Sequence, residues 1–144
     1  FYAPFLHFGF EHLLANTFPF FMLGWFVILR GFGRFVMVIL FSTIVGGLGI
    51  WLFGMTSSNH EGASILVFGF MGYLLFSSIF ERSLQAATLT LVTLFLYSSL
   101  LWGVLPLVEG VSWEGHLFGF IGGAIASWFL SRRGKEEIRM ILDE

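Results

Sequence analysis

The chain has 144 residues, of which 57% are hydrophobic, 19% aromatic and only 11% charged. An ordinary soluble domain is about 45–50% apolar and about 25% charged, so this composition excludes both an ordinary soluble protein and a disordered one. The net charge of −2 without a basic stripe excludes nucleic-acid binding, and the lack of cysteine excludes disulfides and thiolate metal sites. Much of the surface therefore faces lipid.

Charged residues occur in clumps, separated by long uncharged stretches. A helix that crosses about 30 Å of hydrocarbon needs about 20 mostly apolar residues, and five stretches are close to that length. They predict helices at His12–Leu29, Phe35–Phe53, Ser64–Phe80, Gln85–Leu105 and Gly115–Ser131. The strands of a membrane barrel would alternate apolar and polar residues, which the run 35–41 does not. The sequence therefore predicts an all-α polytopic membrane protein with five transmembrane helices.

The basic residues predict how these helices are oriented. All 7 Lys and Arg residues follow the first, third or fifth predicted helix, so they lie on one side of the membrane. That side is cytoplasmic by the positive-inside rule, and the helix starts at His12, Ser64 and Gly115 then face the extracytoplasmic side. Residues 1–131 are expected to form the transmembrane domain. Residues 132–144 are expected to form a charged cytoplasmic tail, with a short helix lying at the interface.

Glycines are concentrated in the second, third and fifth predicted helices. Gly119 and Gly123, followed by Ala126, have the small-residue spacing that lets membrane helices approach closely. The third and fifth helices are therefore expected to touch. Taken alone, the same glycines are more typical of general packing in a helical bundle.

Four polar residues stand out in the predicted membrane helices, where a polar side chain is costly unless it has a function or a partner. They are His12 and Asn16 in the first helix, Ser64 at the start of the third and His116 at the start of the fifth. All four are near the extracytoplasmic end, so they lie at a similar depth. His12 and Asn16 share one helix face, and contact between the third and fifth helices would bring Ser64 beside His116.

This combination predicts the chemistry of a serine hydrolase. The Ser64 hydroxyl would be the nucleophile and the His116 imidazole would accept its proton. Since no acidic residue lies within the predicted helices to orient His116, we expect a dyad oriented by packing, with Phe68 stacked on the imidazole. The backbone N–H of Ser64 and the side chains of His12 and Asn16 could stabilise an oxyanion.

Each residue also has a simpler interpretation. A lone serine in a membrane helix usually donates to its own helix, and a lone asparagine often links two helices. His7 and His60 fit interfacial or structural positions. A haem or metal site is a weaker hypothesis, because His60 and Glu61 lack the second histidine of H-E-x-x-H. A transporter or channel would place polar residues along a path through the membrane rather than at one depth.

The polar residues occur in three blocks that resemble the signatures of rhomboid intramembrane serine proteases. These blocks are His7 to Asn16 (H-x4-H-x3-N), then Gly62-Ala63-Ser64, then His116-x2-Gly119-x3-Gly123, in the family's order. The resemblance implies a rhomboid-like helical bundle with a six-helix core. Since the chain begins with Phe1, we expect a fragment that lacks the first helix of that core.

The resemblance also implies roles and a function. Ser64 would be the nucleophile, His116 the general base, and His12 and Asn16 the oxyanion stabilisers. The same blocks include Gly62 and Gly119, and the family often places a Tyr or Phe at the position of Phe68; these three residues would support the site. Family members need no cofactor or metal.

The implied substrates are transmembrane segments of other proteins, cut near the extracytoplasmic side of the bilayer. We therefore expect an integral membrane protein of a bacterial plasma membrane. The family usually has G-x-S-G, whereas Ile65 follows Ser64 here and could narrow the site. The alternative is an inactive rhomboid-like protein that binds transmembrane helices.

Overall fold

The computed structural model describes residues 10–54, 63–107 and 112–143, and its regular structure in those ranges is entirely helical. The elements are α1 (Phe10–Ile28), α2 (Phe32–Phe53), α3 (Ser64–Glu81), α4 (Leu84–Tyr97), the 3-10 helix η2 (Ser98–Val104) and α5 (Trp113–Leu142). The prediction of an all-α protein is confirmed for the described ranges, and a helix occupies each of the five predicted positions.

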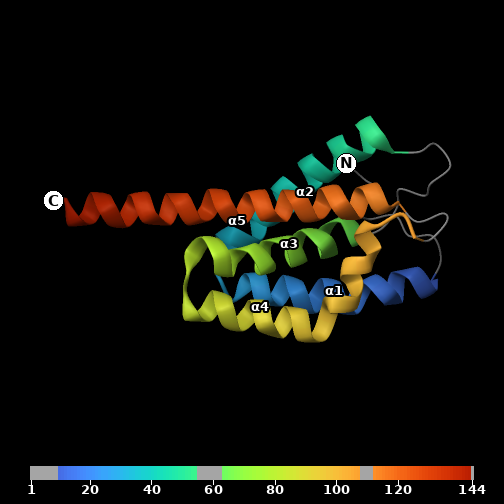
Figure 1. Ribbon diagram of the computed structural model, residues 1–144, viewed down its shortest axis with the longest axis horizontal. Coiled ribbons are helices and arrows are strands. Elements are labelled where there is room, and N and C mark those ends of the chain that lie inside the picture. Colours follow the sequence, from blue (N-terminus) through green and yellow to red (C-terminus); the bar gives the residue numbers. More distant parts are fainter. Residues whose placement is uncertain (1–9, 55–62, 108–111, 144) are drawn as a thin grey trace.

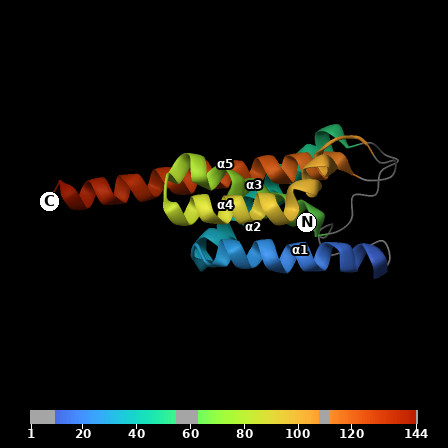
Figure 2. The same ribbon diagram turned by 60° about the horizontal axis from the view of Figure 1, so that its bottom comes forward.

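Helix α3 is at the centre of the bundle. It contacts each of the other four α-helices, with α5 on one side and α4 and α1 on the other (Figure 1 and Figure 2). In α3, 12 of the 18 residues are buried, compared with 4 of 22 in α2 and 4 of 14 in α4. The core of the bundle is built around this helix, including the fully buried Phe70, Tyr73 and Leu74.

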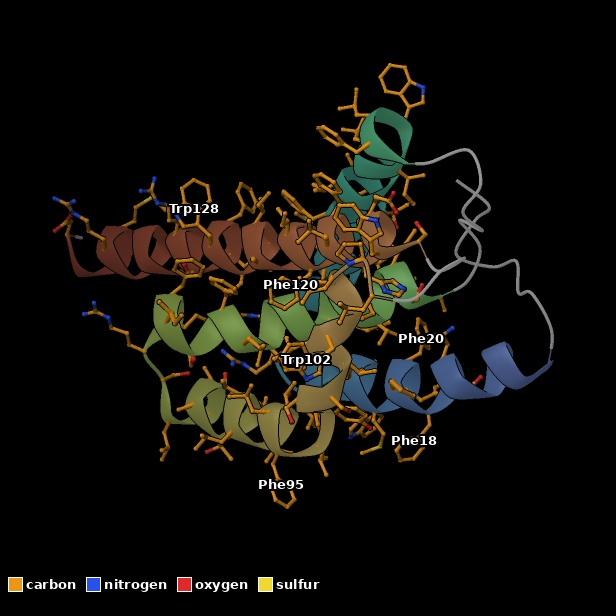
Figure 3. The ribbon with its side chains drawn as sticks, turned by 45° about the vertical axis from the view of Figure 1, so that its right-hand side comes forward. Phe18, Phe20, Phe95, Trp102, Phe120 and Trp128 are labelled. Carbon is orange, nitrogen blue, oxygen red and sulfur yellow. The ribbon has the colours of Figure 1, made fainter. Side chains whose placement is uncertain are left out.

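The outer helices expose apolar side chains, as a protein surrounded by lipid requires. Phe18 and Phe95 point away from the bundle (Figure 3) and are 66% and 87% exposed. Three helical segments are long and apolar enough to cross a membrane: Phe32–Phe53, Ser64–Glu81 and Leu84–Val104. A shorter apolar helix covers Asn16–Ile28. The structure thus supports a membrane protein, with three of the predicted helices meeting the criteria for a full span.

The fourth predicted helix, Gln85–Leu105, is not one regular helix. The α-helical part ends at Tyr97 and the chain continues as the 3-10 helix η2. Two serines and Gly103 in this segment have low α-helical propensity, which reduces the cost of the change. A 3-10 segment of 7 residues is unusually long, and such segments often occur at functional positions.

The tail is also different from its predicted form. Instead of ending near Ser131 and being followed by a separate short helix, α5 is continuous for 30 residues and projects beyond the rest of the bundle (Figure 1). The physical reason is that Arg, Lys and Glu are good helix formers, so a change from apolar to charged composition does not end a helix. At its other end, α5 includes Glu114, which we had expected in the preceding loop.

An ionic cluster joins the ends of α1, α2 and α3. The Glu81 carboxylate forms salt bridges with both Arg30 and Arg34. Arg34 Nη1 also donates a hydrogen bond to the Tyr73 hydroxyl at 3.1 Å. These arginines were predicted to lie at the same side of the membrane as Glu81, and the structure places all three at one end of the bundle.

Candidate active site

Helices α3 and α5 are in contact through their backbones. A Cβ atom at Gly123 would lie only 1.9 Å from the carbonyl oxygen of Gly69, and one at Gly119 would lie 2.5 Å from that of Ile65. Any side chain at these two positions would force the helices apart. The predicted close contact between the third and fifth helices is therefore confirmed.

This contact sets the register of the two helices and therefore the position of the site. The contact of Gly123 with Gly69 lies one helical turn after the contact of Gly119 with Ile65, on both helices. Because the contacts advance in the same direction along both helices, α3 and α5 run parallel. Their N-terminal ends consequently lie at the same end of the bundle. Ser64, the first residue of α3, is 8% exposed, and His116 lies in the first turn of α5 and is half-buried.

The ring of His116 is held on two sides. It stacks on the ring of Phe68 with centroids 4.2 Å apart and an angle of 13° between the planes. Its Nδ1 atom lies 2.8 Å from the carbonyl oxygen of Gly103. Because Phe68 is one helical turn after Ser64, the two residues share a face of α3, and the imidazole over Phe68 lies on the Ser64 side of that helix.

Gly103 is the residue that the sequence interpretation missed at this site. A Cβ atom there would lie 2.7 Å from Cζ of Phe68 and 3.4 Å from Nδ1 of His116. The residue lies in η2, a segment interpreted only as part of an apolar span, and no spacing in the sequence connects it to His116. Only the observation that a glycine interrupts this span could have drawn attention to it.

The bulky residue after Ser64 is accommodated between α2 and the start of α5. Ile65 is 6% exposed, and its Cγ2 atom lies 2.7 Å from where a Cβ of Gly46 would be. Its Cγ1 atom lies 3.4 Å from the corresponding position of Gly115. The side chain thus fills the junction of α2 with the start of α5. The missing side chain of Gly46 provides the space that a β-branched residue requires.

The start of α5 is polar and buried. The Ser112 hydroxyl caps the helix by accepting a hydrogen bond from the backbone N–H of Gly115 at 3.3 Å. Glu114 lies in the first turn, where a negative charge is favoured by the helix dipole, and its side chain is fully buried. Glu114 lies outside the predicted helix Gly115–Ser131, and no sequence pattern connects it with the site.

The remaining predicted site residues are only partly described. Asn16 is half-buried in α1, and the backbone of His12 belongs to the same helix. The side chain of His12 lies outside the described part of the structure, as do Gly62, His7 and His60. Of the described site residues, Phe68 contacts His116, Gly119 packs on the Ile65 backbone, and Ser64 lies one helical turn before Phe68 on α3.

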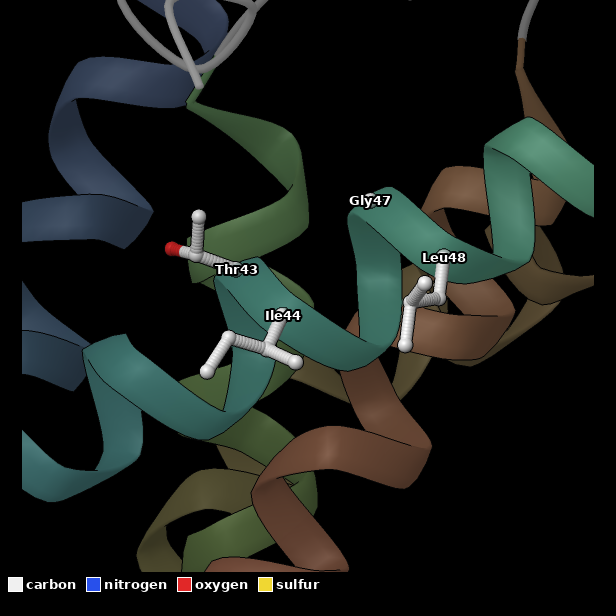
Figure 4. Close-up of a pocket in the computed structure, with 4 residues that line it drawn as sticks. All are labelled: Thr43, Ile44, Gly47 and Leu48. Atoms are coloured by element: carbon white, nitrogen blue, oxygen red, sulfur yellow. The ribbon is translucent and has the colours of Figure 1, made fainter.

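A separate hollow of about 300 Å³ lies on α2 and is lined by Thr43, Ile44, Gly47 and Leu48 (Figure 4). Ile44 and Leu48 are among the exposed apolar residues, whereas the buried Gly46 and Gly49 belong to the side of α2 that packs on the bundle. Among the site residues whose side chains the structure describes, none lines this hollow. It belongs to the outer surface of α2 rather than to the candidate active site.

Comparison with known proteins agrees with the geometry. The family model for the Rhomboid domain matches residues 1–133. An uncharacterized protein of Mycobacterium tuberculosis strain H37Rv is 41% identical over 138 residues, which are 90% of this chain and 58% of that protein. Two further relatives come from Bacillus subtilis strain 168, and both are 32% identical to this chain. The putative rhomboid protease YdcA matches 91% of this chain and 65% of its own length. The rhomboid protease GluP matches 85% of this chain and 24% of its own length. No solved structure matches the chain significantly.

The family match and the apolar helical bundle together support an integral membrane protein. The chain belongs to the rhomboid family. It spans less than three fifths of the length of the mycobacterial relatives that it matches.

Proposed function

We propose that this chain carries the active site of an intramembrane serine endopeptidase, with Ser64 as the nucleophile and His116 as the general base. The observation that carries the proposal is the stacking of His116 on Phe68, one turn after Ser64, at the contact of α3 with α5. Membership in the rhomboid family and similarity to the rhomboid protease GluP support the same class of reaction.

The proposed reaction has two stages. His116 takes the Ser64 proton while Oγ attacks the peptide carbonyl, and the protonated imidazole then donates that proton to the leaving amine as the C–N bond breaks. Water next attacks the acyl ester, losing a proton to His116, and the return of this proton to Ser64 Oγ releases the new carboxyl terminus. No cofactor or metal takes part in either stage.

The negative charge on the carbonyl oxygen needs hydrogen-bond donors. The backbone N–H of Ser64 is available because the first N–H groups of a helix have no partner within the helix. Asn16 and His12 in α1 would supply side-chain donors. Losing one such donor typically lowers a rate by about 10²–10³-fold, so Asn16→Ala should be impaired but still measurable.

We propose transmembrane segments of other proteins as the substrates, cut near the extracytoplasmic side of the bilayer. A regular helix uses its carbonyl groups in internal hydrogen bonds, so a substrate must unwind locally before Ser64 can attack. Segments with Gly, Pro or other helix-weakening residues near the cut should therefore be preferred.

The test is labelling of the purified full-length protein with a fluorophosphonate probe, which reacts only with an activated serine. Wild type should be labelled, and Ser64→Ala and His116→Ala should not. Ser77→Ala is the matched control, since Ser77 is buried in the same helix but donates its hydroxyl hydrogen to the carbonyl of Leu74. Labelling that persists in Ser64→Ala would refute the proposal.

A second candidate is a non-catalytic relative that binds transmembrane helices, and the departure from G-x-S-G at Ile65 favours it. This candidate predicts a folded wild-type protein that captures a transmembrane helix but does not react with the probe. If Ile65 blocks the site, Ile65→Gly should then restore labelling. Because the Ile65 side chain packs against the Gly46 and Gly115 positions, we expect wild type to be labelled without this change.

A further inference from the structure

We propose that Gly103 is a positioning residue for the catalytic histidine, holding His116 in the one tautomer that can act as a base toward Ser64. The proposal rests on the dyad proposed above and goes beyond it, because it assigns the orienting group that a serine–histidine dyad lacks. It is carried by one hydrogen bond, one steric contact and the unusual backbone of η2.

The hydrogen bond determines where the imidazole proton lies. The Nδ1 atom of His116 is 2.8 Å from the carbonyl oxygen of Gly103. A carbonyl oxygen can only accept, so Nδ1 must carry the hydrogen in the neutral ring. The lone pair is then on Nε2, the nitrogen that must receive the Ser64 proton. In a catalytic triad a carboxylate performs this task, and here a backbone carbonyl performs it instead.

The absence of a side chain at Gly103 is equally important. A Cβ atom there would lie 2.7 Å from Cζ of Phe68 and 3.4 Å from Nδ1 of His116. Even an alanine would therefore push against the Phe68 ring that supports the imidazole. Because Phe68 is 4% exposed and packed in the core, it has little room to move.

The 3-10 helix explains how this carbonyl reaches the ring. In a 3-10 helix a carbonyl accepts from the N–H three residues later. For Gly103 that residue is Pro106, which follows the end of η2 at Val104 and has no N–H to donate. The helix end thus leaves the carbonyl of Gly103 free to accept from another element, and α5 places His116 there.

The first experiment reads the tautomer directly by NMR. Full-length protein with ¹⁵N-labelled histidine rings is compared with His116→Ala to assign the His116 signals. We expect the neutral ring to carry its hydrogen on Nδ1 in wild type, and this preference to be lost in Gly103→Ala. A wild-type ring protonated on Nε2 would overturn the proposal. Because this readout does not need activity, it remains decisive even if fluorophosphonate labelling shows that the proposed function is wrong.

The second experiment measures how fast Ser64 reacts with the fluorophosphonate. Gly103→Ala should slow labelling by at least about tenfold, because general base catalysis typically contributes about 10²–10⁴-fold and this variant loses the orientation of the base but not the base itself. Gly47→Ala is the matched control, because a Cβ there meets nothing within 4 Å, and it should react like wild type. Unchanged labelling and an unchanged His116 signal in folded Gly103→Ala would overturn the proposal.

A third variant covers the case in which Gly103→Ala does not fold. Replacing the amide bond between Gly103 and Val104 with an ester weakens the Gly103 carbonyl as an acceptor without adding an atom near Phe68. We expect slower labelling together with a loss of the Nδ1-protonated signal. If both stay at wild-type values, the carbonyl does not position His116.

Discussion

At the scale of single residues, the pairing of Ile65 with Gly46 shows how a bulky side chain fits beside the proposed nucleophile. Gly46→Ala would place a methyl group 2.7 Å from Cγ2 of Ile65. We expect this overpacking to lower the free energy of unfolding by about 1–3 kcal/mol. In an Ile65→Ala background the clashing atom is absent, so the same substitution should cost much less.

A double-mutant cycle of unfolding in detergent micelles measures this coupling. Residues in contact typically couple by about 0.5–3 kcal/mol, whereas independent sites add. If the two substitutions lower the free energy of unfolding by amounts that simply add, Gly46 does not provide the space for Ile65. Gly47→Ala in both backgrounds controls for the effect of alanine in α2.

The proposed site residues that the sequence could suggest are those whose spacing along the chain carries information. Ser64, Phe68 and His116 lie at helix starts or one turn from each other, so their depth and face could be predicted. Gly103 could not be predicted in the same way. Its contact with His116 depends on the change from α4 to η2 and on how that segment packs against α5, and neither is encoded in a local pattern.

At the scale of helices, the contact between α3 and α5 depends on positions where a side chain has no space. A Cβ at Gly123 would lie 1.9 Å from the backbone oxygen of Gly69, and backbone atoms cannot move aside as the end of a side chain can. We therefore expect Gly123→Ala to destabilise the protein by at least about 2 kcal/mol and to abolish fluorophosphonate labelling.

Gly47→Ala is again the control, because its Cβ would lie in open space on α2. It should leave stability unchanged or raise it slightly, since alanine favours a helix over glycine. Thermal unfolding and probe labelling of both variants check the prediction. Wild-type stability and labelling in Gly123→Ala would mean that the α3–α5 contact is not needed for the site.

Helix positions were predictable from charge and hydropathy, but helix ends were not. The third helix begins at Ser64 as predicted, because the polar residues before it end the apolar stretch. The fifth helix, predicted as Gly115–Ser131, instead covers Trp113–Leu142, since its ends depend on the Ser112 cap and on the helix propensity of charged residues. Hydropathy shows which segments can lie in lipid, but it carries little information about the residue at which the backbone hydrogen bonds of a helix end.

At the scale of the whole molecule, the ionic cluster at one end holds three helices together. The Arg30 and Glu81 side chains are only 4% and 11% exposed, so loss of one partner leaves a charge in a largely buried position. Glu81→Gln should lower the free energy of unfolding by about 3 kcal/mol. Asp143→Asn is the control: its pair with Arg139 spans 3.9 Å between highly exposed side chains and should contribute nothing measurable. Equal stability of the two variants would contradict the structural role of the cluster.

The orientation of the whole bundle is a prediction that the lack of cysteine makes simple to test. Leu107, just after η2, and Met140, near the end of α5, are 65% and 64% exposed, so single cysteines there should be comparably reactive. The positive-inside rule predicts that the basic residues lie on the cytoplasmic side. A membrane-impermeant maleimide should therefore label Leu107→Cys on spheroplasts of the expressing bacterium. Met140→Cys should react only after the spheroplasts are lysed. The reverse pattern would place the Ser64 end of the bundle in the cytoplasm. Substrates would then have to be cut on that side of the membrane.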